Sequence, residues 1–155
     1  MNYFDEIKNL IEKIEVNEKV RYIESNKEKV QTYYEIGRLL YEAQGGEKRA
    51  KYGDGLIMRW SKIFESDYGK DYSYRNLNYM RRFYICFQKV NTVCSQFNLS
   101  WSHYKNLLKF NDENERNYYI NLCTQNNLSV RDLQKMNLVL EMILFSDLFL
   151  VRNKI

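Results

Sequence analysis

Not one proline occurs in the 155 residues of this sequence, and that absence constrains the fold more than any other feature. Proline ends or kinks a helix because it lacks a backbone N–H and clashes with the preceding turn. A chain without proline can therefore form long helices. Phe4, Ile7, Ile11 and Ile14 recur at three- and four-residue steps, which is the period of an amphipathic helix. No run alternates apolar and polar residues as a substantial sheet requires, so the sequence predicts an all-α fold.

The same periodicity predicts about six to seven helices in one compact domain. Its expected segments are 2–15, 18–44, 54–68, 74–88, 99–110 and 111–127, a further helix after Ser129, and a short helix or hairpin between 90 and 99. Gly45-Gly46 and Gly69 are expected to end helices, as glycine often does. Gly37 lies inside an apolar stripe, which predicts the close approach of another helix.

Residues 1–136 are expected to form the helical body and residues 137–155 an apolar tail. The stretch 138–151 is too short to span a bilayer and carries Glu141 and Asp147, so no membrane partner is expected. This tail is expected either to be the end of a truncated gene product or to associate with a partner.

Patterns typical of catalysis are missing from the sequence. There is one histidine, His103, and the three cysteines show no C-x-x-C spacing, so we expect no metal site and no cofactor. Glu6 and Lys8 match the E-x-K part of nuclease metal sites, but they lie on an amphipathic helix and are interpreted as surface charge. We therefore predict that the chain is not an enzyme. With no secretory signal, reduced thiols and a cytoplasmic location are expected.

Positive charge is concentrated in the middle of the chain. The whole chain has a net charge of +4, whereas the segment from Lys70 to Lys109 contains seven bases and one acid, Asp71. Such a field favours a polyanionic partner, although a solvated basic face is an equally good interpretation of charge alone.

Residues 72–84 read YSYRNLNYMRRFY, and a helix is expected to begin after Ser73 as its N-cap. Leu77, Met80 and Phe83 should face the core, with the basic side chains opposite. A basic helix entered through a glycine turn from another helix is typical of a helix-turn-helix motif. The candidate nucleic-acid-binding residues are Lys70, Arg75, Asn76, Asn78, Arg81, Arg82 and Lys89. Tyr79 is expected to cover the core, while Tyr72 and Tyr74 could either do so or stack on bases.

Several stretches occur in an order that resembles a known family. They are YYEIGRLLYEAQ (33–44), KYGDGLIMRWSKIF (51–64), DYGKDYSYRNLNYMRRFY (67–84), LSWSHYKNLL (99–108), RNYYINLC (116–123) and LSVRDLQ (128–134). Together they resemble the N-terminal domain of the YhcG-like proteins of bacteria. The resemblance implies a helical, DNA-binding module that normally precedes a PDDEXK-type nuclease domain. The nuclease carboxylates and lysine have no counterpart in this sequence, so no catalytic residue is carried over.

These observations predict a non-catalytic DNA-binding or targeting module of a nuclease system. Phosphates would be neutralised by five bases, namely Lys70, Arg75, Arg81, Arg82 and Lys89. Asn76 and Asn78 would reach base edges or the backbone. The alternative is a protein–protein interaction module, which forms a homo-oligomer or assembles nuclease subunits.

Overall fold

The computed structural model describes residues 3–46, 54–88, 97–139 and 142, and within those ranges every regular element is helical. The predicted all-α class is confirmed. The chain forms two compact units, Met1–Trp101 and Ser102–Ile155, and each is described by itself. The predicted boundary between a body and a tail at residue 136 stays a prediction.

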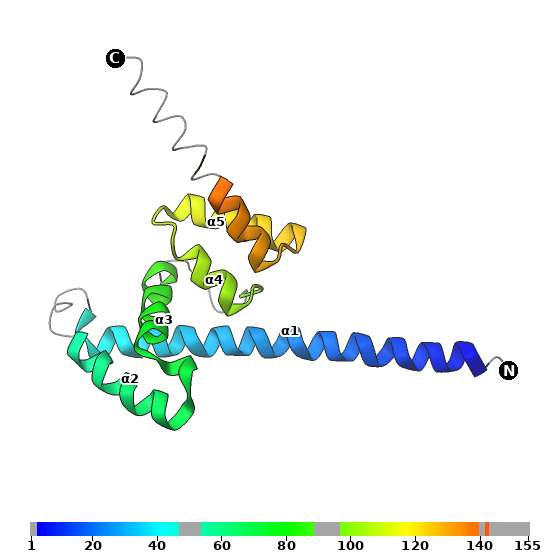
Figure 1. Cartoon of the computed structure of the whole chain (residues 1–155), viewed down its shortest axis with the longest axis horizontal. Coiled ribbons are helices and arrows are strands. Elements are labelled where there is room, and N and C mark those ends of the chain that lie inside the picture. Colours follow the sequence, from blue (N-terminus) through cyan, green and yellow to red (C-terminus); the bar gives the residue numbers. More distant parts are fainter. Residues whose placement is uncertain (1–2, 47–53, 89–96, 140–141, 143–155) are drawn as a thin grey trace, which may run out of the picture. The chain divides into compact units, whose positions relative to one another are not determined.

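The first unit is built on one long helix. Helix α1 spans Tyr3–Ala43 without a break (Figure 1). Two helices, 2–15 and 18–44, are predicted from the sequence, and this prediction is wrong because the connecting residues contain neither glycine nor proline to interrupt the backbone hydrogen bonds. Gly45 and Gly46, with φ of 82° and 65°, end the helix as predicted.

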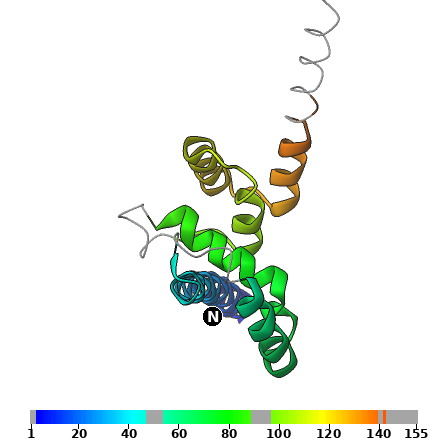
Figure 2. The same cartoon turned by 90° about the vertical axis from the view of Figure 1, so that its left-hand side faces the viewer.

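The core of this unit lies between α1 and α3, which spans Tyr74–Phe87 and crosses the C-terminal half of α1 (Figure 2). Val30, Tyr34 and Leu40 of α1 are buried, as are Leu77, Met80, Phe83 and Phe87 of α3. The two helices approach closely at Gly37, since an added Cβ there would overlap the main-chain carbonyl of Met80. The predicted close approach of a second helix at Gly37 is confirmed.

Helix α2 spans Asp54–Tyr68 and is followed by a 3₁₀ turn, η2, at Lys70–Tyr72. Ile57 is fully buried. An apolar cavity of about 560 Å³ lies between α1 and α2, and its lining includes Leu39, Trp60, Phe64 and Tyr72. Tyr72 therefore belongs to an apolar surface and not to the basic face of α3.

The N-terminal half of α1 extends away from α2 and α3 (Figure 1). Five apolar side chains recur along it at helical spacing, and each is more than half exposed: Phe4, Ile7, Leu10, Ile11 and Ile14. The predicted amphipathic pattern is present, but no described element covers its apolar face.

Helix α4 spans Trp101–Leu107 and belongs to the second unit from Ser102 onward. This unit also contains α5 (Glu113–Asn126) and a helix at residues 130–139. Asp112 caps α5 by accepting a hydrogen bond from the Glu115 N–H at 2.8 Å. Ser129 and Asp132 bond reciprocally at the start of the last helix, with 2.6 Å between Oγ and Oδ2. The predicted helix starts in this unit are therefore confirmed.

The spacing within 111–127 predicts that four residues face inward: Tyr118, Tyr119, Leu122 and Cys123. The structure of α5 differs from this prediction at Tyr118. Tyr119 and Cys123 are buried as predicted, and the Tyr119 ring stacks on Phe110 at 4.5 Å between centroids. Tyr118 was also expected to face inward, yet it is 60% exposed. Adjacent helical residues point about 100° apart, so only one tyrosine of the pair can face the core. The helix or hairpin predicted between 90 and 99 lies largely outside the described residues.

Candidate nucleic-acid interface

A tight turn sets the direction in which α3 leaves α2. Gly69 has a φ of 94°, a conformation that side chains with a Cβ rarely adopt, and its N–H donates to the carbonyl of Glu65 at 3.0 Å. Ser73 occupies the N-cap position of α3 as predicted, although its side chain makes no capping hydrogen bond. The predicted sequence of helix, glycine turn and second helix is thus present at residues 54–87.

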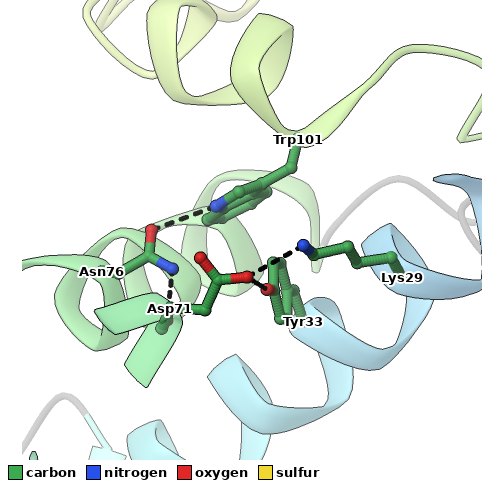
Figure 3. Close-up of polar contacts among 5 residues, drawn as sticks. All are labelled: Lys29, Tyr33, Asp71, Asn76 and Trp101. Atoms are coloured by element: carbon green, nitrogen blue, oxygen red, sulfur yellow. Dashed lines mark hydrogen bonds and ion pairs between the residues drawn. The ribbon is translucent and has the colours of Figure 1, made fainter. Parts of the chain in front are cut away.

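The acid of this turn is held by α1. Lys29 Nζ lies 2.9 Å from Asp71 Oδ2, and the Tyr33 hydroxyl donates to the same oxygen at 3.2 Å (Figure 3). The hydrogen bond to Asp71 raises the pKa of Lys29, and burial raises the pKa of Tyr33. Asp71 is the one acid in the basic segment 70–109. Lys29 therefore neutralises the negative charge that would weaken the positive field of this segment.

Asn76 has a structural role that the sequence did not indicate. Its Nδ2 donates to the main-chain carbonyl of Asp71, and its Oδ1 accepts from the indole N–H of Trp101 at 3.0 Å (Figure 3). Trp101 is 8% exposed, so this acceptor satisfies a polar group that water barely reaches. Both ends of the Asn76 amide are therefore engaged in folding contacts.

Three of the other candidate residues meet on the outer face of α3. Arg75, Asn78 and Arg82, together with Tyr74 and Tyr79, line an open hollow of about 430 Å³. They recur at three- and four-residue steps, which brings their side chains to one face of a helix. Arg75 and Arg82 are exposed, and α3 contains no acidic residue. Two guanidinium groups, one amide and two phenol rings therefore share one surface.

The tyrosines of this face differ in position and contacts. The Arg75 guanidinium lies 5.7 Å from the ring centroid of Tyr79 and 3.4 Å from its hydroxyl oxygen. Tyr79 was predicted to cover the core, and it is half-buried but also lines the hollow. The i, i+4 spacing of Arg75 and Tyr79 is the sequence signal that would have found this pair. Tyr74 is 37% exposed.

The remaining candidates lie apart from this hollow. Arg81 is half-buried, and its Nε is buried without a hydrogen-bond partner among the described residues. Arg81 sits at the edge of the core face of α3 because it follows the buried Leu77 by four residues. Lys70 is exposed in η2. Lys89 lies outside the described residues.

Other reactive side chains are positioned for folding. A ring nitrogen of His103 lies 2.9 Å from the carbonyl oxygen of Leu128, which ties α4 to the end of α5. Burial raises the pKa of the Cys123 thiol.

Glu6 and Lys8 are both exposed on α1, and Lys8 lies 3.8 Å from Glu12. Across the described ranges, no three His, Cys, Asp or Glu residues gather as a metal site would need, and no helix is long and apolar enough to cross a membrane.

Comparison with known families identifies the domain. A family model described as the DUF1016 N-terminal domain matches residues 6–141. The chain belongs to this family. The DUF1016 match begins within the first turn of α1 and runs past the helix at 130–139, so it includes most of the first unit and part of the second.

A curated relative connects the DUF1016 domain with a nuclease. Sixty residues are 52% identical to a protein of Escherichia coli (strain K12) named "Putative nuclease YhcG". The aligned stretch covers 38% of this chain and 16% of that relative. The resemblance to YhcG-like N-terminal domains is confirmed. No solved structure matches the chain.

Proposed function

We propose that this chain is a non-catalytic nucleic-acid-binding module that directs a nuclease to its substrate. One observation carries the proposal: Arg75, Asn78 and Arg82 share an exposed hollow on a helix without acidic residues. A guanidinium fork matches the geometry of a phosphate and keeps its charge at every physiological pH.

The binding mechanism is mainly electrostatic. Arg75 and Arg82 neutralise phosphates from α3, and Lys70 adds a third positive charge from the preceding turn. Asn78 contacts a base edge or the sugar–phosphate backbone. Asn76 is left out of the interface because its amide holds Trp101, and Arg81 contributes at most at the edge. Three phosphate contacts give modest affinity with a clear salt dependence.

The link to a nuclease is supported by family membership and by the name of the relative. A binding domain concentrates a catalytic domain near its substrate without contributing a catalytic group. We propose no reaction for the described helices. The cytoplasm, where bacterial DNA lies and thiols stay reduced, is the location that fits this function.

Titration of labelled single-stranded and duplex DNA, each at 50 and 200 mM salt, tests the proposal. Three phosphate contacts predict a loss of affinity of about 20- to 40-fold between these salt concentrations. The variant Arg75→Gln/Arg82→Gln should weaken binding at low salt and flatten the salt dependence.

The matched control is Arg59→Gln/Lys62→Gln, which removes two exposed charges from α2. It should retain nearly all of the affinity if position on α3 matters more than net charge. Equal losses in the two double variants, or no binding by the wild type at low salt, would contradict the proposal.

A second candidate function is association with another protein chain, favoured by the exposed apolar face of α1. Ile7, Ile11 and Ile14 follow one another at heptad-like steps, as in helices that pair along a seam. Three apolar residues of the predicted tail are also exposed: Leu138, Val139 and Met142. Light scattering of Ile11→Glu against Asn9→Glu, a change off the apolar face, tests this. Only the first should lower the mass of an oligomer, and a wild-type monomer at high concentration would rule out self-association.

A further inference from the structure

We infer that the hollow on α3 takes an unpaired nucleotide, so that the module prefers single-stranded or locally opened nucleic acid over an intact duplex. This inference rests on the proposed nucleic-acid binding and adds the class of substrate to it. Three features of the hollow carry it: the aromatic rings in its lining, the orientation of one amide and the spacing of two guanidinium groups.

The rings in the lining favour an unpaired base. Tyr74 presents an exposed ring, and Tyr79 carries the Arg75 guanidinium 5.7 Å from its ring centroid. In a duplex the faces of the bases are covered by their neighbours, so a protein reaches only base edges and phosphates. Phenol rings and guanidinium planes are stacking surfaces, and they become useful only when a base is unstacked.

The size of the hollow fits a nucleotide-sized ligand. Its volume of about 430 Å³ falls in the range of roughly 300–1,000 Å³ typical of small-ligand sites. A surface that reads duplex phosphates needs no such recess, because a phosphate is reached by a side chain that extends into solvent.

Asn78 is oriented to read the edge of such a base. Its Nδ2 donates to the main-chain carbonyl of Tyr74 at 2.8 Å, which holds the nitrogen of the amide against the helix. That bond does not use the side-chain oxygen, which can accept a hydrogen bond from an amino or imino group of the base. Amide side chains recognise unpaired bases in this way.

Arg75 and Arg82 lie on either side of Asn78 along the helix. Seven residues separate them, which corresponds to about 10 Å along the helix axis. A strand that places one base against Asn78 can therefore present a phosphate to a guanidinium at each end of the hollow. An intact duplex would offer phosphates to the two arginines but would leave the Tyr74 ring without a stacked base.

Removing a ring without changing charge separates the two modes of binding. Fluorescence anisotropy would compare a 15-mer single strand, the matching duplex and the duplex with a three-nucleotide bulge, all at 50 mM salt. Tyr74→Leu should weaken binding of the single strand and of the bulge by about tenfold, since that is the scale of one base–aromatic stack. Duplex affinity should change by less than twofold, and Tyr74→Phe should behave as wild type.

A direct spectroscopic readout comes from 2-aminopurine in the single strand. Its fluorescence should fall on binding to the wild type and to Tyr74→Phe, and should change much less with Tyr74→Leu. Circular dichroism and the thermal midpoint of each variant confirm that α3 is intact.

The outcomes distinguish this inference from the function on which it rests. Duplex affinity equal to or tighter than single-strand affinity, with no effect of Tyr74→Leu, overturns the preference for unpaired nucleotides and leaves nucleic-acid binding standing. Absence of binding to all three probes overturns both.

Discussion

The carbonyl oxygen of Met80 occupies the position that a Cβ at residue 37 would need. The backbone of α3 therefore rests directly on the backbone of α1 at Gly37, and the Cβ of Tyr84 would lie 3.1 Å from the added atom. A contact with main chain is hard to relieve, because neither helix can move without disturbing the aromatic core on both sides.

Gly37→Ala should therefore destabilise the protein by about 1–3 kcal/mol or more, although alanine favours a helix by about 1 kcal/mol over glycine. Gly55→Ala is the matched control, because no atom lies within 4 Å of its added Cβ. That variant should be neutral or slightly stabilising. Urea unfolding of the Gly37→Ala and Gly55→Ala variants tests this prediction. Equal unfolding midpoints would show that the two helices are not in close contact at Gly37.

Substitution of Asn76 should lower the stability of the protein, whereas substitution of Asn78 should weaken nucleic-acid binding. Asn76→Leu leaves the buried indole N–H of Trp101 without its acceptor, which should cost about 1–3 kcal/mol of stability. Asn78→Leu loses only a bond on the surface of α3 and should change stability by about 0.5 kcal/mol or less while weakening nucleic-acid binding. Thermal unfolding and anisotropy on the same samples measure both effects, and reversed roles would contradict the assignment of Asn78 to the interface.

The link between α1 and the turn should fail at alkaline pH. The folded pKa of Lys29 is raised above its ordinary 10.5, so its stabilising effect is complete below pH 10.5 and is lost as pH rises through the folded pKa. Tyr33, raised above 10.0, acts in the same direction from about pH 10. The stability difference between wild type and Lys29→Met should therefore be constant from pH 7 to 9.5 and shrink above that range.

The size of that difference should be modest, on the order of 0.2–1 kcal/mol, because Lys29 and Asp71 are both well exposed. Lys13→Met, which removes an exposed lysine outside this network, serves as the control for general charge effects. Urea midpoints at four pH values would test the prediction. A difference that grows above pH 10 would show that Asp71 does not stabilise the charged lysine.

Cysteine reactivity should differ between the two described thiols. Cys123 is 1% exposed and burial raises its pKa, so both access and thiolate population are low. Cys86 is half-buried. In a Cys94→Ser background, a thiol reagent should modify Cys86 at least about tenfold faster than Cys123, with both reacting once urea unfolds the chain. Removing Cys86 should abolish the fast phase, and a fast phase that survives its removal would contradict the burial of Cys123.

The features that the sequence predicts well are those encoded locally. Gly37 inside an apolar stripe indicates a close approach because glycine has no other advantage in a helix. Gly69 indicates the turn because it tolerates a positive φ. The unbroken α1 was also open to prediction, since residues 15–18 contain neither glycine nor proline.

Contacts between residues distant in sequence could not be predicted from the sequence. Lys29 meets Asp71 across 42 positions, and Asn76 meets Trp101 across 25, with no local signal for either pair. Arg81 follows the apolar stripe at its edge, where periodicity alone does not separate an exposed side chain from a half-buried one. The sequence therefore predicts the candidate residues of α3 as one group. The structure is needed to show which of them are exposed and which make folding contacts.

The length of α1 has a consequence for any assembly of this protein. Ile7 and Gly37 are thirty residues apart on one continuous helix, which is about 45 Å along its axis. The continuous helix would hold a subunit docked on the exposed isoleucines about 45 Å from the contact between α1 and α3. Under the proposed function, a partner on the isoleucines and a nucleic acid on α3 would lie far enough apart for both to be bound at once.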